Sequence, residues 1–144
     1  MEKPILKLRG QGEIWNVLGE KIICKVRGEE TFGRFAVVEE TSPVNSSVPV
    51  HFHNETDEII YILAGKYEMN IDGETVFAEK GEMVVIPRKT RHGFRNLSDT
   101  ESKMLAIITP GGFENFFAEV SRLDEFNFEK IIEIGKRNDL ELVI

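Results

Sequence analysis

The sequence has little of what stabilises a secreted or membrane protein. Of its 144 residues only Cys24 is a cysteine, so no disulfide can form within the chain and folding cannot depend on an oxidising compartment. No apolar run approaches the roughly 20 residues that span a membrane. The segment from Met1 to Gly10 also lacks the apolar core of a signal peptide. We therefore expect a cytoplasmic protein that does not interact with membranes.

Basic residues are also few, with 18 lysines and arginines against 25 acidic residues and a formal net charge of −7. A surface that binds phosphate backbones needs a positive field, so we expect no nucleic-acid partner. One basic cluster, Arg88, Lys89, Arg91 and Arg95, surrounds His92 and would suit an anionic substrate. Strand alternation turns Arg91 and Arg95 away from the His92 side, and we interpret the cluster as a solvated loop.

Up to about residue 109 the pattern predicts strands and turns without helices. Two strands are expected between Ile14 and Val26, and another from Phe32 to Val38. Asp72-Gly73 lies between two alternating segments and is typical of a tight hairpin. Such spacing favours an all-β sandwich or barrel over a parallel sheet with crossover helices. We predict one domain over residues 1–144, with a barrel core at about 14–109 and a C-terminal helical extension at 110–144.

The extension begins after Pro110-Gly111-Gly112 with apolar residues at helical spacing. These residues are Phe113, Phe116, Phe117, Val120 and Leu123. We predict that this helix packs outside the barrel and that its phenylalanines are core residues. A second helix is expected from Phe128 to Lys136, with Asn127 as its N-cap. The apolar end, Leu140 to Ile144, is expected to add a strand or to meet a partner subunit.

The chain has only three histidines, and all of them fall in two strand-like clusters. His51 and His53 share one face of a strand, because alternate residues point to the same side. A turn at Asn54 to Asp57, followed by an antiparallel return, would bring Glu58 beside this pair. After a turn at Pro87, His92 would supply a fourth ligand. Singly these residues are ordinary hydrogen-bonded or solvated groups, but together they favour one metal site.

These clusters resemble the paired motifs of the cupin superfamily. The first motif is matched at the family's intervals by His51, His53, Glu58 and Gly65, and the second by Gly81, Pro87, His92 and Asn96. Two of the family's glycines are replaced, by Asn45 and by Lys89. Asparagine adopts left-handed backbone angles readily and lysine at more cost, so we expect any difference from the family to lie in these turns and not in the ligands.

The resemblance implies a double-stranded β-helix, or jelly-roll barrel, with a metal held by His51, His53, Glu58 and His92. Imidazole and carboxylate together suit one divalent first-row transition metal, namely Fe, Mn, Ni, Co, Cu or Zn, and disfavour calcium and magnesium. An octahedral metal would keep two open positions. Since neutral imidazole is the ligand form, occupancy should fall below about pH 6.

Residues with the same strand parity as the ligands should line a mainly apolar pocket. Of these we select Ile60, Met69 and Phe94 as substrate-binding residues, and we assign no catalytic residue. The resemblance to the quercetin dioxygenase group implies a dioxygenase-like enzyme or an isomerase that acts on a small, partly apolar or aromatic oxygen-donor compound. The alternative is a non-catalytic sensor or carrier of a metal or small molecule. A transcription regulator is disfavoured because no paired basic helices follow. Many cupins are dimers, so we expect a homodimer.

Overall fold

The computed structural model describes residues 3–143, and Met1, Glu2 and Ile144 lie outside the described residues. The strands are β1 (Glu13–Val17), β2 (Glu20–Val26), β3 (Ala36–Ser42), β4 (Ser47–Phe52), β5 (Asp57–Ala64), β6 (Lys66–Ile71), β7 (Glu74–Glu79), β8 (Met83–Ile86), β9 (His92–Asn96), β10 (Ser102–Thr109) and β11 (Glu141–Leu142). The helices are a short 3₁₀ turn, η1 (Gly28–Thr31), and two α-helices, α1 (Glu114–Ser121) and α2 (Phe128–Arg137).

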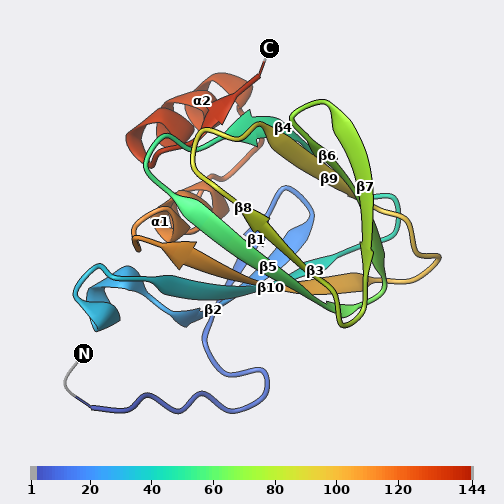
Figure 1. Ribbon diagram of the computed structural model, residues 1–144. Coiled ribbons are helices and arrows are strands. Elements are labelled where there is room, and N and C mark those ends of the chain that lie inside the picture. Colours follow the sequence, from blue (N-terminus) through green and yellow to red (C-terminus); the bar gives the residue numbers. More distant parts are fainter. Residues whose placement is uncertain (1–2, 144) are drawn as a thin grey trace.

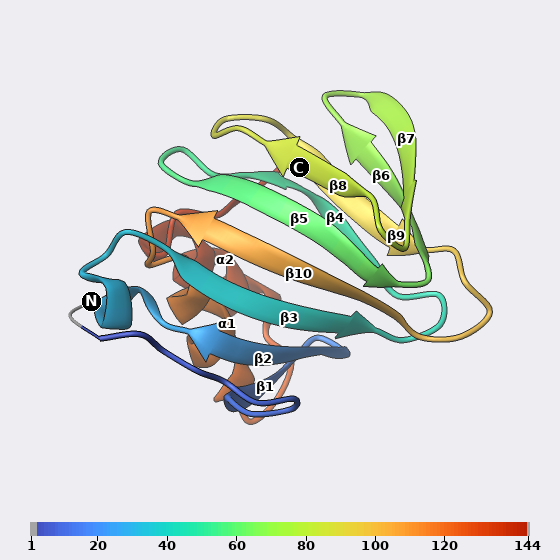
Figure 2. The same ribbon diagram turned by 60° about the horizontal axis from the view of Figure 1, so that its bottom comes forward.

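The strands form two antiparallel sheets that face one another (Figure 1, Figure 2). The six-stranded sheet has the order β1-β2-β3-β10-β5-β8, and the five-stranded sheet has the order β11-β4-β9-β6-β7. Burial alternates along the strands, most regularly in β10, because successive side chains point to opposite faces. The fold is thus the predicted all-β jelly-roll barrel.

The predicted turns occur where the sequence places them. Asp72 and Gly73 join β6 to β7, with φ angles of 49° and 86°, as a two-residue hairpin turn requires. Asn45 and Lys89, which replace glycines of the cupin motifs, keep left-handed angles of 63° and 68°. The turn geometry therefore survives both substitutions.

The strand expected from Phe32 to Val38 begins only at Ala36 and continues to Ser42, so this prediction was wrong at its start. Phe32 and Gly33 instead have left-handed φ angles of 56° and 79°. The Thr31 hydroxyl accepts a hydrogen bond from Phe35 N at 3.1 Å. Such local side-chain bonds compete with strand pairing, and here they hold the segment in a turn.

The two α-helices lie outside the sheets, on the same side of the molecule (Figure 1). The Asn127 side chain accepts a hydrogen bond from Lys130 N at 3.1 Å, which confirms the predicted cap of α2. After α2 the chain returns to the five-stranded sheet, where Leu142 of β11 pairs with His51 of β4. The C-terminal extension is therefore not wholly helical. Its end was expected to add a strand or to meet a partner subunit, and the strand is confirmed.

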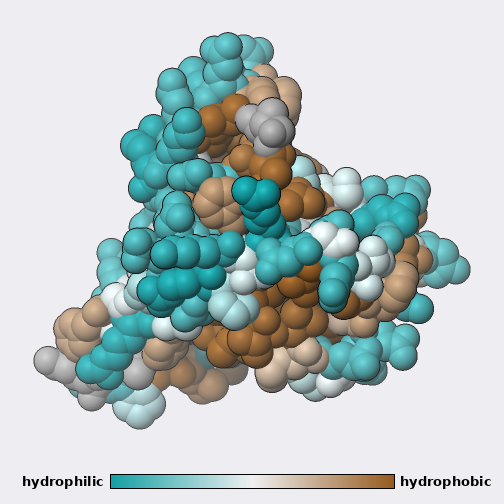
Figure 3. All heavy atoms as spheres, turned by 45° about the horizontal axis from the view of Figure 1, so that its top comes forward, coloured by the Kyte–Doolittle hydropathy of each residue, from teal (hydrophilic) through white to brown (hydrophobic). Residues whose placement is uncertain are grey.

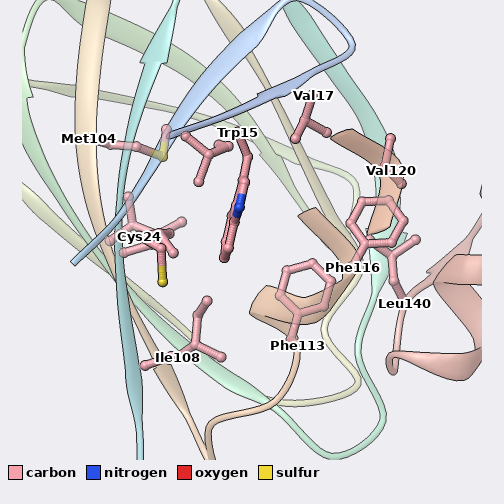
Figure 4. Packing of buried hydrophobic residues seen from close by; sticks show 14 of the residues in the cluster. Trp15, Val17, Cys24, Met104, Ile108, Phe113, Phe116, Val120 and Leu140 are labelled. Atoms are coloured by element: carbon pink, nitrogen blue, oxygen red, sulfur yellow. The ribbon is translucent and has the colours of Figure 1, made fainter. Parts of the chain in front are cut away.

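The phenylalanines that begin the extension are buried, as predicted, and continue the barrel core. Trp15 of β1 packs in one cluster with Cys24 and Ile108 of the sheet and with Phe113 and Phe116 (Figure 4). The Phe113 and Phe116 rings are stacked, with centroids 5.6 Å apart. The helical segment thus closes part of the interior that the two sheets leave open.

Within residues 3–143 neither helix is long and apolar enough to cross a membrane. Some large apolar side chains nevertheless reach the surface, among them Tyr61, Met83 and Val85 on adjacent strands β5 and β8. On the face shown in Figure 3, apolar residues form a continuous area bordered by hydrophilic ones.

Candidate metal centre

The four predicted ligands converge at one point inside the barrel. One ligand atom from each of His51, His53, Glu58 and His92 can be chosen so that all of them lie within 4.8 Å of one another. The four residues are between 2% and 8% exposed. Since no other group of this kind occurs among the described residues, the chain has one candidate metal centre in this range.

The route to this convergence differs from the prediction. His51 lies on β4 and pairs directly with His92 on β9, in the five-stranded sheet. Glu58 lies on β5, which belongs to the other sheet, so β4 and β5 are not the antiparallel hairpin that we expected. Glu58 faces the histidines across the barrel. The prediction failed here because residue spacing indicates that the chain turns back after His53 but not which of the two sheets the next strand joins.

The connection between β4 and β5 is held by Asp139, which follows α2. Its carboxylate accepts hydrogen bonds from Asn54 N at 2.8 Å, Glu55 N at 2.9 Å and the Thr56 hydroxyl at 2.7 Å. These bonds satisfy backbone groups that a strand pair would otherwise occupy. The C-terminal segment therefore fixes the turn that carries His53 toward Glu58.

Each histidine is oriented by a backbone carbonyl. Nδ1 lies 2.9 Å from Pro49 O in His51, 2.7 Å from Asp139 O in His53 and 2.9 Å from Thr90 O in His92. A carbonyl only accepts hydrogen bonds, so each Nδ1 carries a proton, and in the neutral imidazole Nε2 keeps the lone pair that a metal needs. This is the usual outer-shell arrangement of metal-binding histidines.

The inner nitrogens lack suitable protein partners. Nε2 of His53 and of His92 are buried and make no hydrogen bond of acceptable geometry within residues 3–143. His53 Nε2 lies 2.5 Å from Glu58 Oε1 and His92 Nε2 lies 3.7 Å from the same oxygen. Buried polar atoms are rarely left unpaired, and a cation between three lone pairs and a carboxylate would satisfy all of them. The residues present therefore fit a metal ion.

The ionisable groups of the centre shift one another's pKa values. Burial lowers the pKa of His51 to about 4, and the neighbouring His92 and His53 add to the effect. Burial also opposes a charge on His53, but the adjacent Glu58 carboxylate outweighs it and raises the His53 pKa. For Glu58 the contacts with His53 and His92 likewise outweigh burial and lower its pKa well below the usual range. Glu58 is thus an anion in the folded chain.

The basic cluster beside His92 does not contribute to the centre. Arg88, Lys89, Arg91 and Arg95 are all exposed. Arg88 forms an ion pair with Asp57 at 3.2 Å and Arg95 one with Glu68 at 2.5 Å. The interpretation of this cluster as a solvated surface is therefore confirmed.

The centre borders a cavity of about 330 Å³, most of whose walls are apolar. Ile60 and Phe94, two of the residues we predicted to line a pocket, are among its lining residues. Met69 is not among them and packs in the core cluster with Tyr67.

Several cavity residues were not foreseen from the sequence. Phe113, Phe116 and Phe117 line the cavity, and the Phe113 ring lies 4.3 Å from the His53 ring. Helical spacing identified these residues as buried. It gave no sign that the surface they bury is the wall of a cavity beside the metal centre.

Comparison with known proteins agrees with the fold. The family model described as cupin domain matches residues 38–108. An uncharacterized protein of Aquifex aeolicus is 32% identical over 88 residues, covering 61% of this chain and 68% of that protein. Among solved structures, KdgF from Halomonas sp. superposes with a TM-score of 0.68 at 19% identity, covering 75% of this chain and 94% of that one.

A relative of known activity also matches. Quercetin 2,3-dioxygenase of Bacillus subtilis is 33% identical over 89 residues. The match covers 62% of this chain but only 26% of that enzyme, so it relates this chain to about a quarter of the relative's length. Together with the matched family model and the four converging ligands, these likenesses show that the chain belongs to the cupin superfamily.

Proposed function

We propose that this chain is a metal-dependent, dioxygenase-like enzyme that acts on a small, partly apolar or aromatic compound with an oxygen donor. One observation carries the proposal, namely that three imidazoles and one carboxylate converge beside a largely apolar cavity. The likeness to quercetin 2,3-dioxygenase supports the reaction class. Because a fold alone does not determine function, the proposal depends on the chemistry of the site.

His51, His53, Glu58 and His92 would hold one divalent first-row metal, with the imidazole lone pairs directed inward by the three backbone carbonyls. Such a metal supplies a Lewis acid that polarises an oxygen donor. The chain's own residues select the donor and exclude water. Glu58 is also the group placed to accept a proton from a substrate hydroxyl, since its carboxylate reaches the same point as the three imidazoles.

Substrate selection would come from the cavity walls. Ile60 and Phe94 border the cavity from the two sheets, and Phe113 borders it from the C-terminal segment. A cavity of about 330 Å³ is at the small end of ligand pockets. We therefore propose Ile60, Phe94 and Phe113 as substrate-binding residues for a compact, mainly apolar molecule.

The test combines elemental analysis of chain purified without chelators with oxygen uptake against flavonols, diketones and catechols. We expect about one first-row metal per chain and uptake with one of the three classes. Glu58→Gln should abolish uptake, whereas the control Asp57→Asn, one residue away and outside the ligand group, should retain it. Metal-loaded chain that consumes no oxygen with any class would contradict the enzyme and favour a sensor or carrier.

Two further expectations from the sequence stay predictions, a homodimer and a cytoplasmic location. The apolar area in Figure 3 is of the kind that a second subunit covers. Light scattering coupled to size exclusion tests the dimer directly, since the mass of one chain is 16.4 kDa.

A further inference from the structure

Two buried glutamates that the metal centre does not use line the same cavity. Glu20 begins β2 and is 4% exposed, and Glu40 lies on β3 and is 7% exposed. The cavity borders both of them as well as His51 and Glu58. Acidic residues are almost never buried without a partner, so the position of this pair requires an explanation.

The pair is separate from the metal centre. Along β5, Glu58 pairs with Ile108 of β10, whereas Ile62 pairs with Met104, and Met104 in turn pairs with Glu40. The four residues from Glu58 to Ile62 span about 13 Å of strand at ~3.3 Å per residue. Glu40 is thus not a ligand of the metal centre, and the cavity has a polar group at each of two levels.

The two carboxyl groups are close enough to shift each other's pKa, and a proton on one of them would let them share a hydrogen bond. Glu20 Oε2 is buried and has no hydrogen-bond partner among the described residues. Burial and the charges of Glu20 and Glu58 raise the pKa of Glu40 well above its usual range. Burial also raises the pKa of Glu20. Two carboxylates in contact rarely ionise together, which favours a proton on the pair.

The pair has unused hydrogen-bonding capacity. The Ser42 hydroxyl donates to Glu20 Oε1 at 2.8 Å and accepts from the Tyr67 hydroxyl at 2.9 Å. For Glu40, Glu20 is the one side chain within residues 3–143 placed to share a hydrogen bond. No lysine or arginine of that range lines the cavity. The Glu40 carboxyl therefore faces the cavity without a counter-ion and with oxygens available to a ligand.

We propose that Glu20 and Glu40 form a second recognition site, which hydrogen-bonds a hydroxyl group of a ligand whose other end supplies the oxygen donor to the metal centre. This inference rests on the proposed function and adds a substrate class, a mainly apolar molecule with polar oxygens at both ends. A hydroxyl both donates and accepts, so it is satisfied whether the pair holds one proton or two. An ammonium only donates, so it would be satisfied only while one carboxylate of the pair is ionised, whereas a hydroxyl suits both protonation states.

The test uses the full chain loaded with Co²⁺, without oxygen, and three catechols that differ only in a propyl, a hydroxyethyl or an aminoethyl arm. Calorimetry measures each dissociation constant. We expect the hydroxyethyl probe to bind about 10-fold more tightly than the propyl probe, as one hydrogen bond to an acid pair predicts. Equal binding of these two probes, or tightest binding of the aminoethyl probe, would overturn the inference. This comparison needs no variant.

Variants then assign the effect to the pair. Glu40→Met keeps the side-chain length but removes hydrogen bonding, and it should abolish the preference for hydroxyethyl while leaving propyl binding unchanged. Glu39→Met, on the same strand with its side chain ion-paired to Lys103 at the surface, is the matched control and should keep the preference. A preference that survives Glu40→Met would refute the role of the pair.

Failure of the proposed function would look different. Chain that takes up no Co²⁺ contradicts the metal centre itself. Chain that takes up Co²⁺ but binds none of the catechols contradicts the proposal of a small-molecule pocket and, with it, the proposal of a second recognition site. Chain that binds the propyl and hydroxyethyl probes equally leaves the metal-dependent function intact and removes only the acid-pair inference.

Discussion

The two polar clusters of the cavity differ in what satisfies them. At the metal centre the three Nδ1 atoms bond to backbone carbonyls, while Nε2 of His53 and His92 have no suitable hydrogen-bond partner within residues 3–143. At the acid pair, Glu20 and Glu40 lie close to one another and the Ser42 hydroxyl donates a hydrogen bond to Glu20. A cation would complete the first cluster, whereas the second needs only a proton, which water supplies.

This difference explains how one barrel tolerates both clusters. Burying an unpaired polar group costs free energy, and each cluster avoids most of that cost by a separate means. The metal centre depends on a ligand from outside the chain. The acid pair depends on a shift in proton affinity. Variants should accordingly change metal affinity at the first cluster and the pH dependence of stability at the second.

The largest effect is expected from loss of a histidine ligand. His51→Ala and His53→Ala should each lower metal affinity by at least about 100-fold, since even loss of an outer-shell partner costs roughly 10–100-fold. Metal competition with a chromophoric chelator measures this. Phe52→Leu, between the two histidines but on the opposite face of the strand, is the control and should bind metal normally. Unchanged affinity in His53→Ala would exclude this residue as a ligand.

The next effect concerns the bonds that orient His53. Asp139→Asn keeps a residue that tolerates the left-handed angle at this position, where φ is 63°, but weakens the bonds to Asn54, Glu55 and Thr56. We expect about 10-fold weaker metal binding and a loss of roughly 1–2 kcal/mol in the free energy of unfolding. Asp124→Asn, in an exposed loop, should change neither. Metal binding as tight as in the parent would show that the Asp139 carboxylate is not needed to position His53.

At the acid pair we expect a gain in stability. Because the folded-state pKa of Glu40 is raised, its contribution to stability is complete below the unfolded pKa, near 4.5, and is lost as pH rises toward the folded value. Glu40→Gln removes this loss and should raise the free energy of unfolding by about 1 kcal/mol at neutral pH, with little gain at low pH.

Urea unfolding at a series of pH values measures that gain, with Glu39→Gln as the control from the outer face of β3. A Glu40→Gln variant that is less stable than the parent at neutral pH would mean that Glu40 is stabilised as an anion. The acid pair would then need a counter-ion, and the contrast with the metal centre would disappear.

The smallest effect is expected in the turn before His92. Lys89 has a left-handed φ of 68°, and relief of that strain by Lys89→Gly should raise the free energy of unfolding by about 0.5 kcal/mol. Asn45→Gly should gain less, because asparagine tolerates this conformation. Metal affinity should not change in either variant. A drop in affinity with Lys89→Gly would show that the lysine side chain itself supports the centre.

Much of the fold follows from local signals. The Asp72-Gly73 turn and the Asn127 cap each depend on neighbours in the sequence, and each was predicted. The late start of β3 was not, because the hydrogen bonds of Thr31 that hold the preceding turn compete with an equally plausible strand pattern. Prediction succeeded where one local interaction dominates.

The ligands were predicted, whereas their surroundings were not. Strand parity and spacing select His51, His53, Glu58 and His92, but no local pattern shows that Glu58 reaches them from the opposite sheet. The cavity is even harder to predict from the sequence, because Phe113 and Glu40, which line it, come from segments that meet only in the folded chain. Burial of Phe113 could be predicted, and its contact with the His53 ring could not.

The most direct measurement is the anomalous scattering of crystals grown with Co²⁺. The central claim predicts one strong peak enclosed by Nε2 of the three histidines and a carboxylate oxygen of Glu58, at coordination distance from each. A peak bound elsewhere, or crystals of the Co²⁺-treated chain with no peak among these four side chains, would contradict it.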